Sequence, residues 1–357
     1  MKQVILSLLL LSLYTGMQAQ SLIDKDIQRI ASGALAEEIS HCPEEAIRYA
    51  GVVVQEISTG NIVANVSLSY QDGQFIMTPD ANAESFPTGL GRSVLYLAMM
   101  PEGDPYMVVN TKGGVYVDEE GTSIEDHNAR RGGYGLLDLK KAYTNNSDIG
   151  ILLCAEKIFN KDMKKYAQAI NKTGALFGAR ASEDYEGMWK SRAILGYTSP
   201  MSLLQMVCWC NAVAGGKFVI RMDENDSQEP YDKIENIQGL DSLRSAMRET
   251  VTEGLGIRMR SELVSVAAMT NSSPLDVEGY KGLFAAGYFP YEKPGIGYTV
   301  GVYIMKHWEK GYASPSNVVR KIIDWTACNK LKEPPYLSFD DSPAIWHKEG
   351  YIHPAER

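Results

Sequence analysis

Residues 50–68 read AGVVVQEISTGNIVANVSL and contain two runs of β-forming residues around a turn. The runs 51–57 and 62–68 are rich in valine and isoleucine, whose branched side chains suit a pleated strand. The stretch between them, STGN, consists of residues that are common in tight turns. The sequence therefore predicts a β-hairpin near the start of the chain.

A second group of β-rich runs lies near the other end of the chain, at 263–268, 284–289 and 297–305. The residues between about 85 and 260 have the pattern of helices and loops, with helices expected at 92–100, 149–159, 162–171, 200–214 and 241–253. Strands at both ends with helices between them predict an α+β fold. We expect one antiparallel sheet, built from both chain ends, with an inserted helical block.

The composition is that of an ordinary globular protein. The chain has 357 residues, of which 45% are hydrophobic and 22% are charged, so it can bury a sizeable core without disulfides or metals. Its formal net charge is −9, and no run of Lys or Arg interrupts this acidity. Binding to nucleic acid or to an anionic membrane surface is therefore not expected.

The first twenty residues, MKQVILSLLLLSLYTGMQAQ, resemble a secretory signal peptide. The apolar run from Val4 to Leu13 is too short to span a bilayer, although Met17 stands where a small residue is preferred before cleavage. We predict a signal peptide over 1–20, one domain over 21–335 and a tail over 336–357. The mature chain is expected to have no transmembrane helix and to be exported to the periplasm or cell envelope, with an uncleaved anchor as the alternative.

The cysteines and histidines predict neither a disulfide framework nor a metal site. The five cysteines are scattered, and Cys208 and Cys210 point in different directions if they lie on a helix. The five histidines form no motif with metal-ligand spacing. We therefore expect buried, inert thiols, and the sequence predicts no metal and no cofactor.

The stretch Glu84–Met100, ESFPTGLGRSVLYLAMM, is a proline- and glycine-containing turn that runs into an apolar helix. Such a turn often presents a nucleophile to a cleft, because the N–H groups at a helix N-terminus favour developing negative charge. Here the turn contains Gly89 and Arg92, and neither residue is a nucleophile.

Several segments, in this order, resemble the transpeptidase domain of penicillin-binding proteins, a member of the penicillin-recognising serine acyl-transferase and β-lactamase-like superfamily. The hairpin at 50–68 is similar to the family's first two strands. The segments that carry the rest of the resemblance are GTSIEDHN, GLLDLKKAYTNNSDIGILLCAEKIF, LGYTSPMSLLQMVCWCNAVAGGK and FAAGYFPYEKPGIGYTVGVYI. The resemblance covers residues 48–325 and implies a β-lactamase-like and transpeptidase-like fold.

The family's acyl transfer needs three motifs, Ser-x-x-Lys, Ser-x-Asn and Lys-Thr-Gly, which supply a nucleophile, its amine base, a shuttling hydroxyl and a carboxylate site. All three are altered in this chain. The nucleophile position holds Gly89 and the lysine position holds Arg92; the second motif reads Asn146-Ser147-Asp148 and the third Met269-Thr270-Asn271-Ser272. These nine residues form the predicted degenerate cleft.

Loss of such a nucleophile lowers turnover by a factor on the order of 10⁶. Arg92 cannot replace the lysine as a base, because a guanidinium stays protonated. No serine in the chain has a lysine three residues after it. The sequence therefore predicts no catalytic residue at the three motifs, although a charge-assisted contact between Arg92 and Asp148 would fill the cleft.

Three further features resemble parts of the altered catalytic motifs. Cys154 and Lys157 have the Ser-x-x-Lys spacing, but we expect a buried thiol and a solvated lysine. The sequence Lys172-Thr173-Gly174 reads as a helix exit upstream of the place where the third motif belongs. Ser93 or Ser147 remains as a shifted nucleophile, although Ser147 is also suited to cap the helix that follows.

Three functions remain open from the sequence. The leading hypothesis is a non-catalytic pseudo-transpeptidase domain that binds a cell-wall component such as peptidoglycan, or an envelope protein. The alternative is an active penicillin-binding transpeptidase, carboxypeptidase or hydrolase with a shifted serine. A third hypothesis is a structural subunit of an envelope assembly that holds a partner's peptide in the groove.

Overall fold

The computed structural model describes residues 22–331, apart from 79–84, 88–90, 105, 120, 122, 175–190, 196–199, 224, 227–231, 235 and 276–277. The predicted signal peptide and the predicted tail lie outside the described residues. Among those residues, none of the helices combines the length and the hydropathy that a membrane span requires.

A six-stranded sheet forms the centre of the structure, with the strand order β12-β13-β14-β1-β2-β3. Every neighbouring pair is antiparallel. The first hairpin pairs with a strand from the far end of the chain, since Val53 of β1 lies opposite Gly301 of β14. The strands are β1 (Ile47–Glu56), β2 (Ile62–Gln71), β3 (Gln74–Thr78), β12 (Ala267–Pro274), β13 (Tyr280–Phe289) and β14 (Tyr298–His307). The predicted α+β fold with a sheet built from both chain ends is confirmed.

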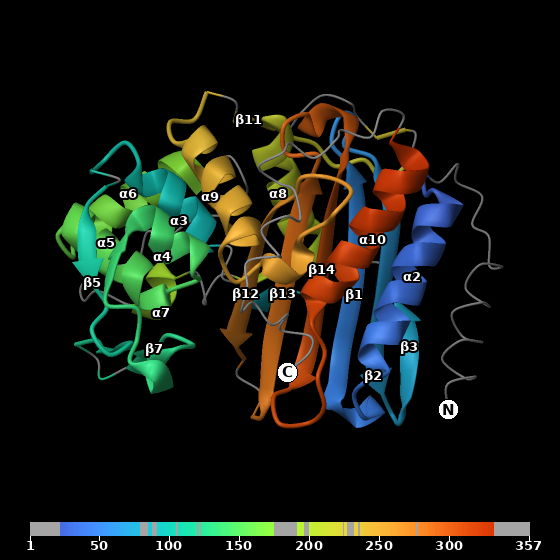
Figure 1. Cartoon of the computed structure of the whole chain (residues 1–357), viewed down its shortest axis with the longest axis horizontal. Coiled ribbons are helices and arrows are strands. Elements are labelled where there is room, and N and C mark those ends of the chain that lie inside the picture. The colour runs from blue at the N-terminus through green and yellow to red at the C-terminus, as the bar shows by residue number, and fades with distance from the viewer. Residues whose placement is uncertain are drawn as a thin grey trace, which may run out of the picture.

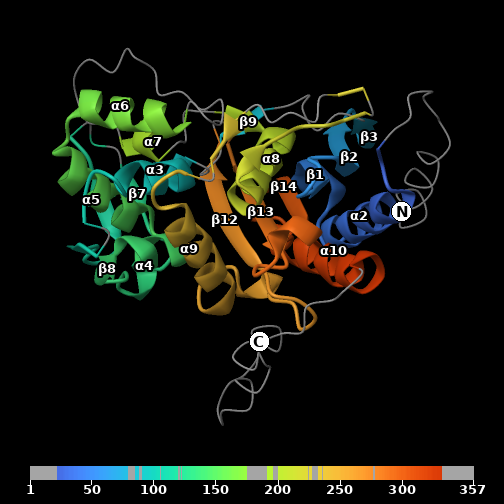
Figure 2. The same ribbon diagram turned by 90° about the horizontal axis from the view of Figure 1, so that it is seen from above.

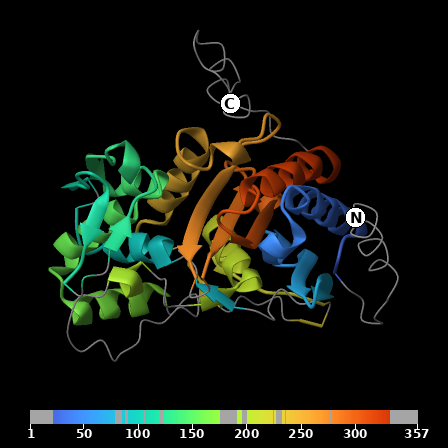
Figure 3. The ribbon, with the colours of Figure 1, turned by 90° about the horizontal axis from the view of Figure 1, so that it is seen from below.

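Helices cover both faces of this sheet (Figures 1 and 2). Helices α2 (Lys25–Ile39) and α10 (Pro315–Lys330) pack against each other on one face, side by side in Figures 1 and 3. Helix α8 (Leu203–Gly215) packs on β1, β13 and β14 from the opposite face. Each face buries a hydrophobic core of its own.

Helix α8 approaches the sheet closely because two strand positions are glycine. A Cβ at Gly51 would lie 2.8 Å from Leu203 Cδ2, and one at Gly301 would overlap the side chain of Val207. Ser202 caps the helix in a capping box with Gln205. These contacts fix the helix that carries Cys208 and Cys210, and both thiols are fully buried.

The remaining helices form a block beside β12 (Figure 2). They are α3 (Gly91–Met99), α4 (Leu139–Thr144), α5 (Asp148–Phe159), α6 (Met163–Gly174), α7 (Ser191–Ile194) and α9 (Leu240–Thr252). Short strand pairs, which the sequence did not predict, complete the structure. The pairs β5 (Val108–Asn110) with β8 (Leu136–Asp138) and β6 (Val115–Val117) with β7 (Ser123–Glu125) accompany the block, whereas β4 (Ser85–Pro87) with β9 (Pro200–Ser202) and β10 (Lys217–Phe218) with β11 (Asp232–Lys233) lie beside α8.

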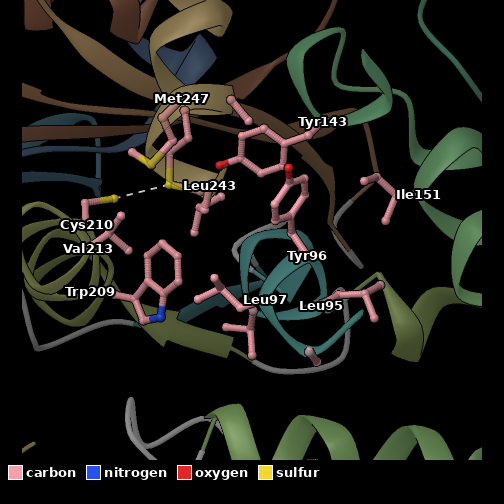
Figure 4. Close-up of a cluster of buried hydrophobic side chains, with 14 of the residues drawn as sticks. Leu95, Tyr96, Leu97, Tyr143, Ile151, Trp209, Cys210, Val213, Leu243 and Met247 are labelled. Atoms are coloured by element: carbon pink, nitrogen blue, oxygen red, sulfur yellow. Dashed lines mark hydrogen bonds between the residues drawn. The ribbon is translucent and has the colours of Figure 1, made fainter. Parts of the chain in front are cut away.

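The interior of the block is continuous with the core under the sheet (Figure 4). Tyr96 of α3 and Tyr143 of α4 pack edge to face, with ring centroids 5.4 Å apart. Cys210 of α8 donates a hydrogen bond to the sulfur of Met269 on β12 at 3.2 Å, the dashed line in Figure 4. The edge of the sheet is therefore anchored to the helical core directly below the predicted cleft.

The strand predicted at 263–268 is misplaced, because β12 begins only at Ala267. The hydroxyl of Ser261 accepts hydrogen bonds from the backbone N–H groups of Leu263 and Val264 at 3.0 and 3.3 Å. These bonds hold residues 261–264 in a turn, so the backbone joins the sheet only after them, where β12 begins.

The two helices α2 and α10 were not predicted, and they are tied together by a buried carboxylate. Glu38 of α2 is 3% exposed. Its Oε1 accepts hydrogen bonds from Ser314 N at 2.7 Å and from Asn317 Nδ2 at 3.2 Å, at the start of α10. The negative charge also suits the positive end of the helix dipole.

We expect Glu38→Ala to lower the free energy of unfolding by about 1 to 3 kcal/mol, because the buried groups at the start of α10 lose their acceptor. Glu37→Ala is the matched control: its carboxylate pairs with Lys321 at the surface, and an exposed pair contributes about 0 to 1 kcal/mol. Urea unfolding followed by tryptophan fluorescence measures both. Equal losses in the two variants would contradict this role of Glu38.

Candidate functional site

The three altered motifs converge between the helical block and the sheet edge. Arg92 lies in the first turn of α3, Asn146 to Asp148 form the start of α5, and Met269 to Ser272 lie on β12. Gly89 and the residues beside it, 88–90, lie outside the described residues. The structure thus places eight of the nine predicted cleft residues.

Arg92 is the centre of this site, although it carries a full charge and is only 4% exposed. Its Nη1 donates to Asp148 Oδ1 at 2.7 Å, and that carboxylate side chain is 16% exposed. The same nitrogen lies 3.5 Å from the carbonyl oxygen of Asn146, whose backbone adopts a left-handed conformation with φ 53°. The predicted contact between Arg92 and Asp148 is confirmed.

Arg92 also bonds to the third motif. Its Nη2 donates a hydrogen bond to the side-chain oxygen of Asn271. The amide of Asn271 is oriented by Ser273, whose hydroxyl accepts from Asn271 Nδ2 at 2.7 Å. Asn271 stands at the position where the related motif has glycine, so a side chain occupies space that would admit a substrate backbone. One guanidinium therefore joins all three motif segments.

The second motif has a structural role at the start of α5. The hydroxyl of Ser147 accepts from Gly150 N at 2.9 Å and caps the helix, which confirms the capping role expected from the sequence. The same hydroxyl donates to Asp126 Oδ2 at 2.6 Å, and Asp126 Oδ1 accepts from Ile149 N at 3.2 Å. The hydroxyl is fully buried and has both a donor and an acceptor as partners.

Two features determine the electrostatics at the start of α5: the ion pair of Arg92 with Asp148, and a buried carboxyl group, Asp126, whose pKa is raised. Burial raises the pKa of Asp126 above its ordinary value of 3.8, although the hydrogen bonds from Ser147 and Ile149 oppose this effect. Asp126 was not among the predicted site residues. The available signal was its place in the segment GTSIEDHN, which carries part of the resemblance.

The space left between the motifs is small. A pocket of about 10 Å³ is lined by Arg92, Ser93, Tyr143, Asn146, Thr250, Met269 and Thr270. This volume is about the minimum that holds one ordered water. Met269 is buried where the related motif has a lysine, whereas Ser272 is exposed on the strand. Side chains therefore fill most of the cleft among the described residues.

Among the described residues, the side-chain partner of the Ser93 hydroxyl is a phenol and not a base. Its hydroxyl is fully buried and lies 2.9 Å from the hydroxyl of Tyr143. Burial raises the pKa of Tyr143, so this phenol stays protonated. A neutral phenol can share a hydrogen bond with Ser93 but cannot remove its proton at neutral pH.

The two imitations of catalytic motifs lie elsewhere. Cys154 is fully buried on α5, and burial raises the pKa of its thiol to about 12; Lys157 donates instead to the carbonyl oxygen of Val108 at 2.9 Å. Lys172, Thr173 and Gly174 are the last residues of α6, not part of a strand. All five cysteines are free. Within the described ranges, no group of His, Cys, Asp and Glu side chains is arranged to hold a metal ion.

Comparison with known proteins identifies the fold that holds these residues. No protein-family model matches the sequence, and no curated protein matches it. The transpeptidase domain of penicillin-binding protein 3 from Burkholderia pseudomallei is similar in structure, with a TM-score of 0.69 at 18% identity over 90% of this chain and 99% of that one. The fold is that of a penicillin-binding-protein transpeptidase domain. A peptidoglycan glycosyltransferase from Burkholderia ambifaria gives 0.67 at 18% identity, over 89% of this chain and 100% of that one.

This transpeptidase-like fold agrees with the resemblance found in the sequence, and it accounts for the convergence of the three motif segments. At 18% identity the likeness concerns the fold alone. The chemistry of the site depends on its own residues. Arg92, paired with Asp148, stands at the lysine position of the first related motif, and Asn271 stands at the glycine position of the third.

We expect Arg92→Leu to lower the free energy of unfolding by about 3 kcal/mol, because it removes the buried guanidinium that pairs with the mostly buried carboxylate of Asp148. Adding Asp148→Asn to Arg92→Leu should recover part of this loss. The control is Arg29→Leu, which breaks an exposed pair with Asp26 and should cost about 0 to 1 kcal/mol. Urea unfolding of the wild type, Arg92→Leu, Asp148→Asn and the double variant measures the coupling between the two residues, and additive losses in the double variant would contradict it.

The raised pKa of Asp126 predicts a pH dependence of stability. A carboxyl group with a higher pKa in the folded state binds more protons there, so stability falls as the pH rises through that pKa. Asp126→Asn removes this titration while it keeps one oxygen acceptor. As the pH is lowered from neutral toward 3.8, wild-type stability should rise relative to Asp126→Asn in urea titrations. A constant difference would contradict the pKa shift.

Proposed function

We propose that this protein is a non-catalytic, transpeptidase-like domain of the cell envelope that binds peptidoglycan. The observation that carries the proposal is the buried guanidinium of Arg92, bonded to Asp148 and Asn271 where acyl transfer requires a free amine and an open substrate cradle. A protonated guanidinium does not take a proton from a serine. The described cleft therefore has no matched nucleophile and base.

Peptidoglycan is the proposed ligand for two reasons. The structural neighbours are named for penicillin binding and for peptidoglycan glycosyl transfer, and β12 forms the outermost strand of the described sheet beside the cleft. An extended stem peptide would add hydrogen bonds along such an edge. The signal-peptide-like N-terminus supports export to the periplasm or envelope.

The absence of acylation is tested with fluorescent penicillin. We expect no labelled band after denaturing electrophoresis of the folded protein, and no mass adduct at saturating β-lactam, while an active penicillin-binding protein in the same experiment is labelled. A stable adduct would contradict the proposal. If that adduct disappears in Ser93→Ala or Ser147→Ala, the shifted serine of the alternative enzyme is identified.

Binding is tested separately by co-sedimentation with purified sacculi. We expect the wild-type protein to sediment with peptidoglycan, and muramidase digestion of the sacculi to release it. Failure to sediment would contradict peptidoglycan binding and favour the alternative of an envelope protein partner. A pull-down from envelope extract would then identify that partner.

A further inference from the structure

The contact between Arg92 and Asn271 joins two parts of the molecule that face each other across the cleft. Arg92 lies on α3 and its ion-pair partner Asp148 on α5, and both helices belong to the helical block. Asn271 lies on β12, at the edge of the sheet. This hydrogen bond therefore spans the cleft, whereas the ion pair lies on one side of it.

We propose that the bond between Arg92 and Asn271 is a latch that holds the cleft closed, and that ligand entry along β12 requires Arg92 to release Asn271. This inference rests on the proposed function, because it assigns a gate to the same cleft. Among the described residues, the closed form leaves a pocket of about 10 Å³ between the motif segments, which is room for about one water molecule. A binding-competent cleft thus needs these side chains to separate.

When the latch opens, the charge of Arg92 can stay paired with Asp148. When Arg92 leaves Asn271, its guanidinium keeps the carboxylate of Asp148 at 2.7 Å within the same block. The hydrogen bond that is given up has a neutral acceptor, the side-chain oxygen of Asn271, and loss of one hydrogen bond to a charged group shifts an equilibrium by at least about tenfold. A bond of this strength holds the closed form in excess and still permits opening.

A second hydrogen bond, to Ser273, orients the side-chain amide of Asn271. Ser273 is 2% exposed, and its hydroxyl accepts from Asn271 Nδ2 at 2.7 Å. That bond directs Asn271 Oδ1 toward Arg92. An aspartate at position 271 would keep an acceptor for the guanidinium, whereas an alanine would keep none, so only the alanine is expected to release the latch.

A native methionine reports opening. Met269 lines the pocket and is 5% exposed, so release of the latch should admit peroxide to its thioether, which is oxidised to the sulfoxide. Met206 and Met259 are fully buried in the two cores and do not line the pocket. They are oxidised quickly only if the whole domain unfolds.

The experiment compares peroxide oxidation of the full-length protein, Asn271→Ala, Asn271→Asp and Ser58→Ala, with rates read for each methionine by peptide mass spectrometry. We expect the rate at Met269 to rise at least about tenfold in Asn271→Ala, while Met206 and Met259 stay at wild-type rates. Asn271→Asp and the control Ser58→Ala, at an exposed residue in the turn after β1, should keep Met269 protected.

An unchanged rate at Met269 in Asn271→Ala would overturn the latch, and so would a rise shared equally by Met206 and Met259, since that indicates global unfolding. Sacculus co-sedimentation of the same variants separates the two proposals. Faster oxidation of Met269 without peptidoglycan binding by any variant supports the latch and contradicts only the proposed ligand. Binding by the wild type with no change at Met269 supports the ligand and contradicts the latch.

Discussion

A charge buried in the cleft constrains the whole site, because a guanidinium removed from water must be paired and hydrogen-bonded. Arg92 meets this requirement through Asp148 and Asn271. The pairing explains why the second motif carries a carboxylate and the third an amide. Arg92, Asp148 and Asn271, one altered position from each motif, are therefore parts of one interaction.

The scaffold around that interaction does not depend on catalysis. The pairing of β1 with β14 joins the two chain ends in one sheet, and α8 packs closely against it at Gly51 and Gly301. The caps on α5 and α8 use serine hydroxyls that accept from backbone N–H groups. Such packing and capping would hold the motif segments in place with or without a nucleophile, so likeness of fold does not require the same chemistry.

The local sequence pattern predicted the first hairpin and the cap at Ser147, and the order of strands and helices predicted a sheet built from both chain ends. The positions of the three motifs came from the resemblance to a transpeptidase domain. The sequence did not predict α2 and α10, whose stability depends on packing against the sheet and on the distant contact of Glu38 with the start of α10. Asn271 was placed in the cleft, but its bond to Arg92, 179 residues away, follows from tertiary geometry that no local pattern encodes.

The most direct test of the account is a crystal structure determined in the presence of saturating β-lactam. The account predicts the Arg92 guanidinium within hydrogen-bonding distance of both Asp148 and Asn271, with no covalent adduct on any serine. An acyl group on Ser93 or Ser147, with Arg92 displaced toward solvent, would contradict it.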